Sequence, residues 1–139
     1  MKNEDAFDRD LANMAVNEAL DAGAEYAEAR MECSVSNGLL LKNGNPEISD
    51  FGTSTGMCVR VLVHGGMGFA STDRLDSDSV RERVSTAVRM AKASSKLVER
   101  RIVLSDEPCH VVEYSVPQKS KITEVELDVT GGGYRVGHA

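Results

Sequence analysis

Tryptophan is missing from the 139 residues, and aromatic residues together make up only 4% of the chain. With so few large rings, the interior has to be filled by aliphatic side chains, and we expect a core of valine, leucine, alanine and methionine. No apolar run approaches the roughly 20 residues of a membrane-spanning helix. No apolar segment follows the polar start, residues 1–5, as it would in a secretory signal. These absences favour a cytoplasmic protein that has no contact with a membrane.

A surplus of positive charge is also lacking, because 22 acidic residues outnumber 16 basic ones and give a net charge of −6. Proteins that bind DNA or RNA through phosphates need a basic surface. The densest basic cluster, Lys96, Arg100 and Arg101 with Glu99 among them, is typical of a solvated helix end. The charge therefore argues against direct nucleic-acid binding.

Cysteine is too scarce and too scattered for a disulfide framework. The three cysteines, Cys33, Cys58 and Cys109, are odd in number and form no C-x-x-C pair. We interpret them as reduced, buried thiols of a cytosolic protein.

The motif of a zinc peptidase helix is absent as well. Such a helix needs two histidines that project together and a nearby glutamate. The three histidines are His64, His110 and His138, and none begins an H-E-x-x-H motif. We therefore predict no catalytic residue and no metal site in these residues.

Two further candidates for chemistry are weak. Cys58 and His64 would lie about 20 Å apart along one strand, too far for a nucleophile and its base. Residues 65–68 are rich in glycine but lack both phosphate-loop patterns, so a turn between two strands is the better interpretation.

Two segments have helical periodicity. The first is predicted from Asp5 to Ala22, capped by residues 3–5 and stopped by Gly23. The second follows the cap formers of residues 76–78 and a capping box of Ser79 and Glu82, and it runs to about residue 94. Its apolar stripe consists of Val80, Val84, Ala87, Val88 and Ala91.

Between these helices the period falls to two, as in strands with one buried face. We predict five short strands over residues 27–35, 39–42, 46–51, 57–64 and 67–71. The predicted connections are Asn37-Gly38, residues 43–45, a polar stretch at 52–56 and Gly65-Gly66. Tight turns require antiparallel neighbours, so the fold class is α+β: a two-layer sandwich with a mainly antiparallel sheet packed against two amphipathic helices.

Beyond the second helix the patterns weaken. Residues 102–104 and 110–116 have strand character, interrupted by Pro108 and Pro117. Residues 122–129 fit either helix or strand, and the glycine-rich residues 131–139 specify no regular structure.

Two arginines lie on the side of the predicted sheet that faces away from the core. Arg30 and Arg60 both point away from the apolar face. Each is either a solvated surface residue or the partner of a carboxylate in a second domain, a second subunit or a bound peptide. The sequence leaves both readings open.

The order of several segments resembles the N-terminal domain of the TldD/PmbA family, also called modulators of DNA gyrase. The segments are L-D-A-G-A-E-Y-A-E-A-R at 20–30, L-K-N-G at 41–44, S-T-G-M-C-V-R-V at 54–61 and G-F-A-S-T at 68–72, before a helix with Ala87 and Ala91-Lys92. The resemblance covers residues 6–95. It implies that residues 1–98 form this α/β domain and residues 99–139 a linker and the truncated start of a following region.

The resemblance implies an oligomeric protein, because members of the family form homodimers or pair two paralogues. One type carries H-E-x-x-x-H later in the chain and resembles a zinc metallopeptidase acting on peptides, whereas the other lacks the metal ligands. Zinc is thus expected only in a C-terminal half that is absent here.

By this resemblance the chain is a scaffold, substrate-groove and assembly domain, with a peptide substrate bound by the full assembly. The groove or interface candidates are Arg30, Arg60, Gly56, Gly68, Phe69 and Ser71. The first alternative is a non-enzymatic interaction module, such as a PmbA-type partner subunit. The last is a small-molecule enzyme whose site residues are dispersed.

Overall fold

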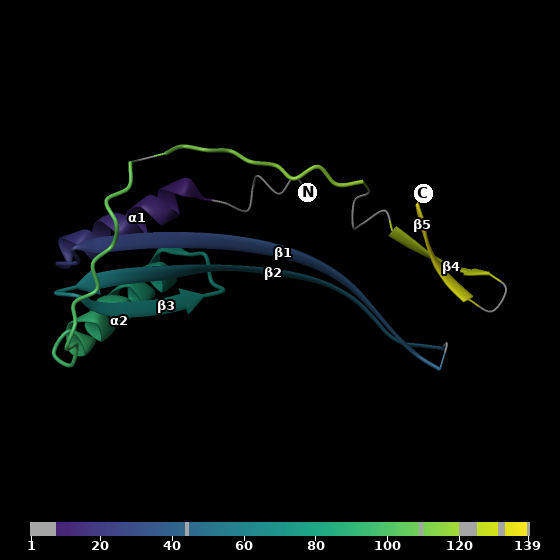
Figure 1. Cartoon of the computed structure of the whole chain (residues 1–139), viewed down its shortest axis with the longest axis horizontal. Helices are drawn as coiled ribbons and strands as arrows, with labels where there is room; N and C mark the ends of the chain where they lie inside the picture. The colour runs from purple at the N-terminus through teal and green to yellow at the C-terminus, as the bar shows by residue number, and fades with distance from the viewer. Residues whose placement is uncertain (1–7, 44, 109, 120–124, 131–132, 139) are drawn as a thin grey trace. The chain divides into compact units, whose positions relative to one another are not determined.

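The computed structural model of the chain describes residues 8–43, 45–108, 110–119, 125–130 and 133–138 (Figure 1). Two helices and five strands occur in these residues: α1 Arg9–Asp21, β1 Tyr26–Lys42, β2 Asn45–Val63, β3 Gly66–Thr72, α2 Ser77–Ser94, β4 Val125–Thr130 and β5 Gly133–His138. Contacts divide the chain into two compact units, Met1–Ser34 with Ser54–Asp106 and Val35–Thr53 with Glu107–Ala139.

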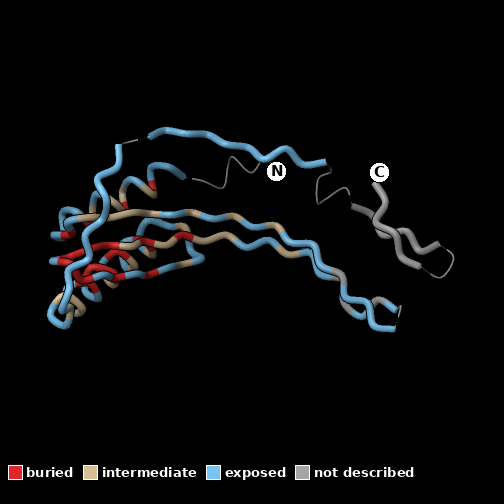
Figure 2. The backbone as a smooth tube through the Cα atoms, viewed as in Figure 1, coloured by how far each residue is buried: buried red, intermediate tan, exposed pale blue. Residues whose placement is uncertain are grey.

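The first unit is the predicted α+β sandwich. Strands β1, β2 and β3 form one sheet in that order, and the buried stripes of α1 and α2 join the buried residues of the sheet in a single core (Figure 2). The core is aliphatic, as the scarcity of aromatics predicts, and its largest fully buried side chains are those of Val59, Val61, Val63 and Val80.

Helix α1 starts later than the sequence pattern predicts. The carboxylate of Asp8 accepts hydrogen bonds from the backbone N–H groups of Asp10 and Leu11, at 2.9 and 3.1 Å, and so caps the helix. The predicted start at Asp5 was therefore wrong by four residues, and the proposed cap residues 3–5 lie outside the described residues. Gly23 follows the helix with a φ of +95°, as predicted for the stop.

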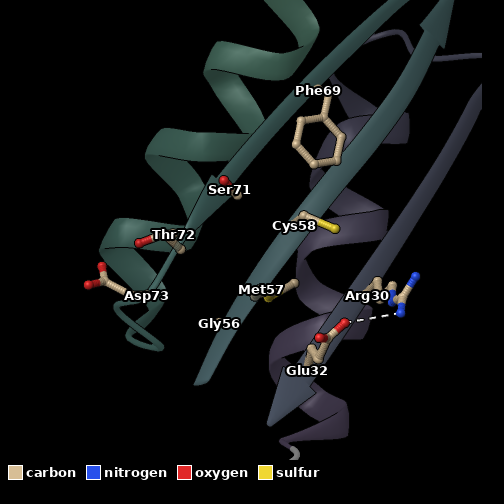
Figure 3. A pocket seen from close by; sticks show the side chains of 9 residues that line it. All are labelled: Arg30, Glu32, Gly56, Met57, Cys58, Phe69, Ser71, Thr72 and Asp73. Atoms are coloured by element: carbon tan, nitrogen blue, oxygen red, sulfur yellow. Dashed lines mark hydrogen bonds and ion pairs between the residues drawn. The ribbon is translucent and has the colours of Figure 1, made fainter. Parts of the chain in front are cut away.

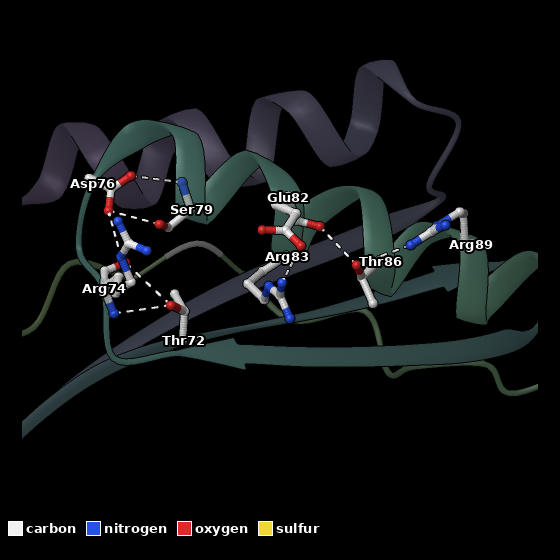
Figure 4. A network of polar contacts seen from close by, with 8 residues as sticks. All are labelled: Thr72, Arg74, Asp76, Ser79, Glu82, Arg83, Thr86 and Arg89. Atoms are coloured by element: carbon white, nitrogen blue, oxygen red, sulfur yellow. Dashed lines mark hydrogen bonds and ion pairs between the residues drawn. The ribbon is translucent and has the colours of Figure 1, made fainter.

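Helix α2 buries the five residues of its predicted stripe. Its cap is Asp76, whose carboxylate accepts the backbone N–H of Ser79 at 2.8 Å and the hydroxyl of Ser79 (Figure 4). The hydrogen bond from the Ser79 backbone, and then that from its side chain, lowers the pKa of Asp76. The capping box predicted at Ser79 and Glu82 was wrong, since Ser79 lies inside the first turn as a donor to Asp76.

Two glycines let α2 lie directly on β3. A Cβ atom added to Gly68 would be 1.9 Å from the carbonyl oxygen of Ala87, and one added to Gly66 would be 2.3 Å from the nitrogen of Ser95. The predicted turn is present, one residue earlier than predicted, and the packing of α2 against Gly66 and Gly68 was not predicted. His64 and Gly65, with φ values of +50° and +78°, form the two-residue turn.

The sheet has three strands where the sequence predicted five shorter ones. The Asn37-Gly38 pair lies within β1 and the polar stretch 52–56 within β2, so both predicted connections were wrong. The connection predicted at residues 43–45 is confirmed, because β1 ends at Lys42, β2 begins at Asn45 and Asn43 has a φ of +52°. A two-residue turn at the first pair is excluded, because the Ser36 hydroxyl donates to the carbonyl of Gly52 at 3.4 Å, which places the two strands side by side beyond that pair. Only residues 57–63 of β2 pair with β3.

The strands predicted at 102–104 and 110–116 do not form. Residues 110–116 are exposed, and no strand among the described residues pairs with either segment, so alternation alone did not produce a strand. The described residues of the basic cluster at 96–101 lie beyond the end of α2 rather than within it.

Strands β4 and β5 form an antiparallel hairpin. The absence of regular structure predicted for the last residues was therefore wrong for 133–138. The composition of these residues did not predict a strand, because the strand depends on hydrogen bonds to residues 125–130. Ile122 lies outside the described residues.

Candidate functional site

One side of the three-stranded sheet carries no helix, and we call it the open face. Because successive side chains of a strand point to opposite sides, Cys58, Arg60 and Leu62 of β2 lie here, and Met57, Val59, Val61 and Val63 point into the core. The register pairs Cys58 with Ser71 and Arg60 with Phe69 across β2 and β3. The open face thus collects polar and apolar groups side by side.

A hollow of about 600 Å³ lies on this face around Gly56, and we call it the Gly56 hollow (Figure 3). It is lined by Arg30, Glu32, Gly56, Met57, Cys58, Phe69, Ser71, Thr72 and Asp73. Gly56 has no side chain to fill the space, and a Cβ atom added there would meet the carbonyl oxygen of Thr72 at 3.2 Å. The lining comes from all three strands and from the residue after β3.

Four of the six residues predicted from the sequence line this hollow: Arg30, Gly56, Phe69 and Ser71. Arg60 lies outside the lining, and Gly68 lies on the opposite side of the sheet against Ala87 of α2. Sequence reasoning missed Glu32, Cys58 and Asp73. The alternation of β2 could have placed Cys58 beside Gly56, but the pairing with Glu32 and Asp73 needs the register.

Arg60 belongs to a polar cluster with Glu28 and Tyr26. Its guanidinium donates to the Glu28 carboxylate at 2.9 Å, and the Tyr26 hydroxyl donates to the same oxygen. The hydrogen bond from Tyr26, and then those with Arg60, lower the pKa of Glu28, while the same bond to Glu28 raises the pKa of Tyr26. Arg60 therefore has a carboxylate partner within its own sheet.

Arg30 also has a partner in its own strand. Its guanidinium donates to Glu32 at 3.0 Å, and both side chains are largely exposed. An exposed ion pair of this kind contributes little to stability and can be exchanged for another partner.

The far end of the open face is covered by the segment that follows α2. Residues 101–106 line a second cavity of about 370 Å³ together with Glu25, Tyr26, Leu62 and Gly65. The backbone N–H of Ile102 donates to the carbonyl of Gly65 at 3.4 Å, and a Cβ atom on Gly65 would be 2.7 Å from the Arg101 side chain. This cover helps to keep Leu62 buried.

The described residues do not fit a zinc centre. Within the described ranges no group of three or more histidine, cysteine, aspartate or glutamate side chains is placed to hold a metal ion. His64 lies 3.1 Å from Glu25 at the β2–β3 turn and outside the Gly56 hollow that Cys58 lines. No helix in the described part is long and apolar enough to cross a membrane.

Comparisons with known proteins agree with this fold. Residues 27–91 match the sequence profile of PmbA/TldA metallopeptidase domain 1. A metalloprotease of Methanocaldococcus jannaschii is 29% identical over 118 residues, which cover 85% of this chain and 26% of the relative.

Two solved structures share the fold. TldE from Thermococcus kodakarensis has a TM-score of 0.66 at 15% identity, with 83% of this chain and 26% of that chain covered. A candidate modulator of DNA gyrase from Bacteroides thetaiotaomicron has a TM-score of 0.59 at 18% identity, with 81% and 24% covered.

The chain thus spans about a quarter of the length of the relatives that it matches. The matched residues 27–91 include all of β1 except Tyr26, all of β2 and β3, and most of α2, and with them every residue that lines the Gly56 hollow. Residues 27–91 of the chain thus correspond to the first domain of the PmbA/TldD family.

Proposed function

We propose that this chain is a scaffold and assembly domain that presents an extended peptide to a metallopeptidase centre located elsewhere in a PmbA/TldD-type protein. The observation that carries the proposal is the Gly56 hollow beside the free edge of β3. In this proposal the zinc and the catalytic residues belong to a region outside these 139 residues. It is supported by the lack, among the described residues, of a group of three or more side chains placed to hold a metal ion.

The edge of β3 supports binding of an extended chain. The two-residue turn makes Val63 and Gly66 a hydrogen-bonded pair. Hydrogen-bonded pairs alternate along an antiparallel ladder, so Gly68, Ala70 and Thr72 also bond to β2 through their main chains. Phe69 and Ser71 lie between these residues and direct their main-chain groups away from β2. Among the described residues no other hydrogen bond engages these groups, whereas the carbonyl of Met67 accepts the Ser94 hydroxyl at 3.0 Å.

An extended peptide added to such an edge is held mainly by its main chain, so affinity depends little on peptide sequence. This suits a domain that serves a peptidase. The names of the relatives, a metalloprotease and TldE, motivate both the peptidase and the partner subunit in this proposal.

The edge is tested with N-methylated peptides bound to the 139-residue chain. Methylation at alternate residues removes the N–H groups that face β3, and we expect binding to be lost. Methylation at the intervening residues leaves those groups intact and serves as the matched control. Equal binding of both peptides would contradict strand addition.

Assembly is tested by the mass of the chain in solution and by metal analysis of the same sample. We expect a dimer or larger species that contains no stoichiometric zinc and does not cleave peptides. A monomer with one tightly bound zinc would overturn the proposal. An oligomer that binds neither of the two N-methylated peptides would favour a non-enzymatic interaction module. The gyrase-modulator name of one relative suggests such a role.

A further inference from the structure

Helix α2 lies directly on β3, so one flank of the helix borders the free edge of that strand. Gly66 and Gly68 leave no room for a side chain between the strand and the backbone of α2. The Ser94 hydroxyl donates to the carbonyl of Met67 at 3.0 Å. Met67 directs its main-chain groups away from β2, so this hydrogen bond places Ser94 at the free edge.

Arg83 lies on the same flank of α2 as Ser94. Ser94 follows Arg83 by eleven residues, which is about three turns of an α-helix, so the two side chains leave the helix in nearly the same direction. The opposite flank faces α1, because Lys92 donates to the carbonyl of Ala22 at 2.9 Å. Figure 4 shows the Arg83 guanidinium below α2, on the side of β3.

Along the helix, Arg83 is level with Ala70 of β3. The first residue of β3 lies against the C-terminal end of α2, and Gly68 lies against Ala87, so the helix and the strand run in opposite directions. Four residues back from Ala87 is Arg83, about 6 Å away along the helix. Two residues on from Gly68 is Ala70, about 7 Å away along the strand and in the same direction.

The present partner of Arg83 is a weak one. Among the described residues its guanidinium pairs with the carboxylate of Glu82, whose side chain is 69% exposed. Consecutive residues of a helix do not face each other, and an ion pair in water contributes little and is readily exchanged. The cap residue Asp76 pairs with Arg74 instead. Arg83 can therefore bind another carboxylate that reaches the free edge.

A peptide strand on the free edge brings its side chains to this flank of α2. Such a strand lies about 4.8 Å from β3, and its side chains alternate between the open face and the side of α2. The peptide residue beside Ala70 points toward α2, because the side chain of Ala70 is buried on that side. This peptide residue and Arg83 thus extend toward each other from neighbouring elements.

Resting on the peptide-binding function above, we propose that Arg83 makes the edge of β3 select an acidic side chain at the peptide residue beside Ala70. The carboxylate of the peptide takes the place of Glu82 as the partner of the guanidinium. The two adjacent peptide residues point to the open face, so the preference does not extend to them.

The test measures binding of the 139-residue chain to three fluorescein-labelled peptides of seven residues with blocked ends. All other residues are threonine, and the central residue is glutamate, glutamine or lysine. At about 0.15 M salt we expect glutamate to bind about two- to fivefold tighter than glutamine, the range of one exposed ion pair. Lysine should bind weakest, and the advantage of glutamate should shrink at about 1 M salt.

Two variants locate the effect at Arg83. In Arg83→Gln the advantage of glutamate over glutamine should disappear, with binding of the glutamine peptide unchanged. In Arg83→Glu the order should invert, so that lysine binds tighter than glutamate, a result that loss of structure cannot produce. Arg89→Gln is the matched control, because Arg89 lines the groove between α1 and α2 on the other flank and its loss should leave the preference unchanged.

The outcomes separate the two proposals. Equal affinity for all three peptides would overturn selection by Arg83 and leave peptide binding intact. A glutamate advantage that persists in Arg83→Gln, an equal loss of it in Arg89→Gln, or a preference of the unchanged chain for lysine would likewise overturn the selection. Failure of every peptide to bind would overturn the peptide-binding function and the selection together.

Discussion

Gly56 and Gly68 both lack a side chain, but they lie in different surroundings. At Gly56 the missing atoms leave a hollow on the open face, and the nearest obstacle to a Cβ is 3.2 Å away. At Gly68 the missing atoms let the backbone of α2 approach, and a Cβ would be 1.9 Å from the carbonyl of Ala87. The sequence could not distinguish these two roles, because both follow from what lies opposite in the fold.

We predict that Gly68→Ala lowers the free energy of unfolding by about 1–3 kcal/mol, because α2 must move away from β3. The measurement is urea unfolding followed by circular dichroism. Gly38→Ala is the control, since its Cβ would meet only the carbonyl oxygen of Asp50 at 3.9 Å. It should leave stability unchanged or raise it by up to about 0.5 kcal/mol. Equal losses in both variants would contradict the packing role of Gly68.

A second residue-scale prediction concerns Glu28, whose pKa is lowered chiefly by the hydrogen bond from Tyr26. A carboxyl group with a lowered folded pKa stabilises the protein above its unfolded pKa, here near 4.5. That contribution is lost as the pH falls below this value. In a carbon-13 NMR titration, Tyr26→Phe should move the midpoint of the Glu28 carboxyl upward, and Arg60→Gln should do so to a smaller extent. An unmoved midpoint in Tyr26→Phe would show that the hydrogen bond is not its main cause.

Among the elements, the β1–β2 hairpin departs most from the sequence-based interpretation. The pattern predicted a turn at both Asn-Gly pairs, and local chemistry could not show that the first pair would lie inside a strand. The choice depends on which register lets both strands pair over their full length, which is a property of the partner strand and not of the turn. The helices, by contrast, were predictable because each apolar stripe repeats within its own local sequence, and Gly23 marks the end of α1.

The two asparagines give a matched test of the turn. We expect Asn43→Val to destabilise the hairpin by about 1–2 kcal/mol, because a β-branched residue is disfavoured at a φ of +52°. Asn37→Val, inside β1, should be neutral or favourable, since valine suits a strand. Hydrogen exchange of the amides of residues 35–42 reports the difference. Faster exchange in Asn37→Val than in Asn43→Val would place the turn at the first pair.

The start of α1 is open to a similar comparison. Asp8→Ala should cost about 1 kcal/mol of stability, because two backbone N–H groups lose their acceptor. Asp8→Ser retains a capping oxygen and should recover most of the loss in the same thermal unfolding measurement. A loss of similar size in both variants would mean that the cap is not the cause.

At the scale of the whole molecule, the division between residues 98 and 99 stays a prediction from the family resemblance. The described residues that follow it, up to 119, contain no helix or strand. We expect the glutamate-specific V8 protease to cleave first at Glu99, Glu107 or Glu113. Mass spectrometry of the first fragments checks this. A first cut at Glu18 or Glu82, within the helices, would contradict the division.

The alternation of β2 has a consequence for how the chain can change in evolution. Val59 and Val61 face the core while Cys58 and Arg60 face outward. Deletion of one residue between 57 and 63 would therefore turn every later side chain of the strand over, and a deletion before Arg60 would bury the arginine. Single-residue insertions and deletions should therefore be purged from this stretch among natural homologues. Changes in length should accumulate instead around the hairpin end at residues 43–45, where strands can lengthen or shorten by two residues at a time without exchanging their faces.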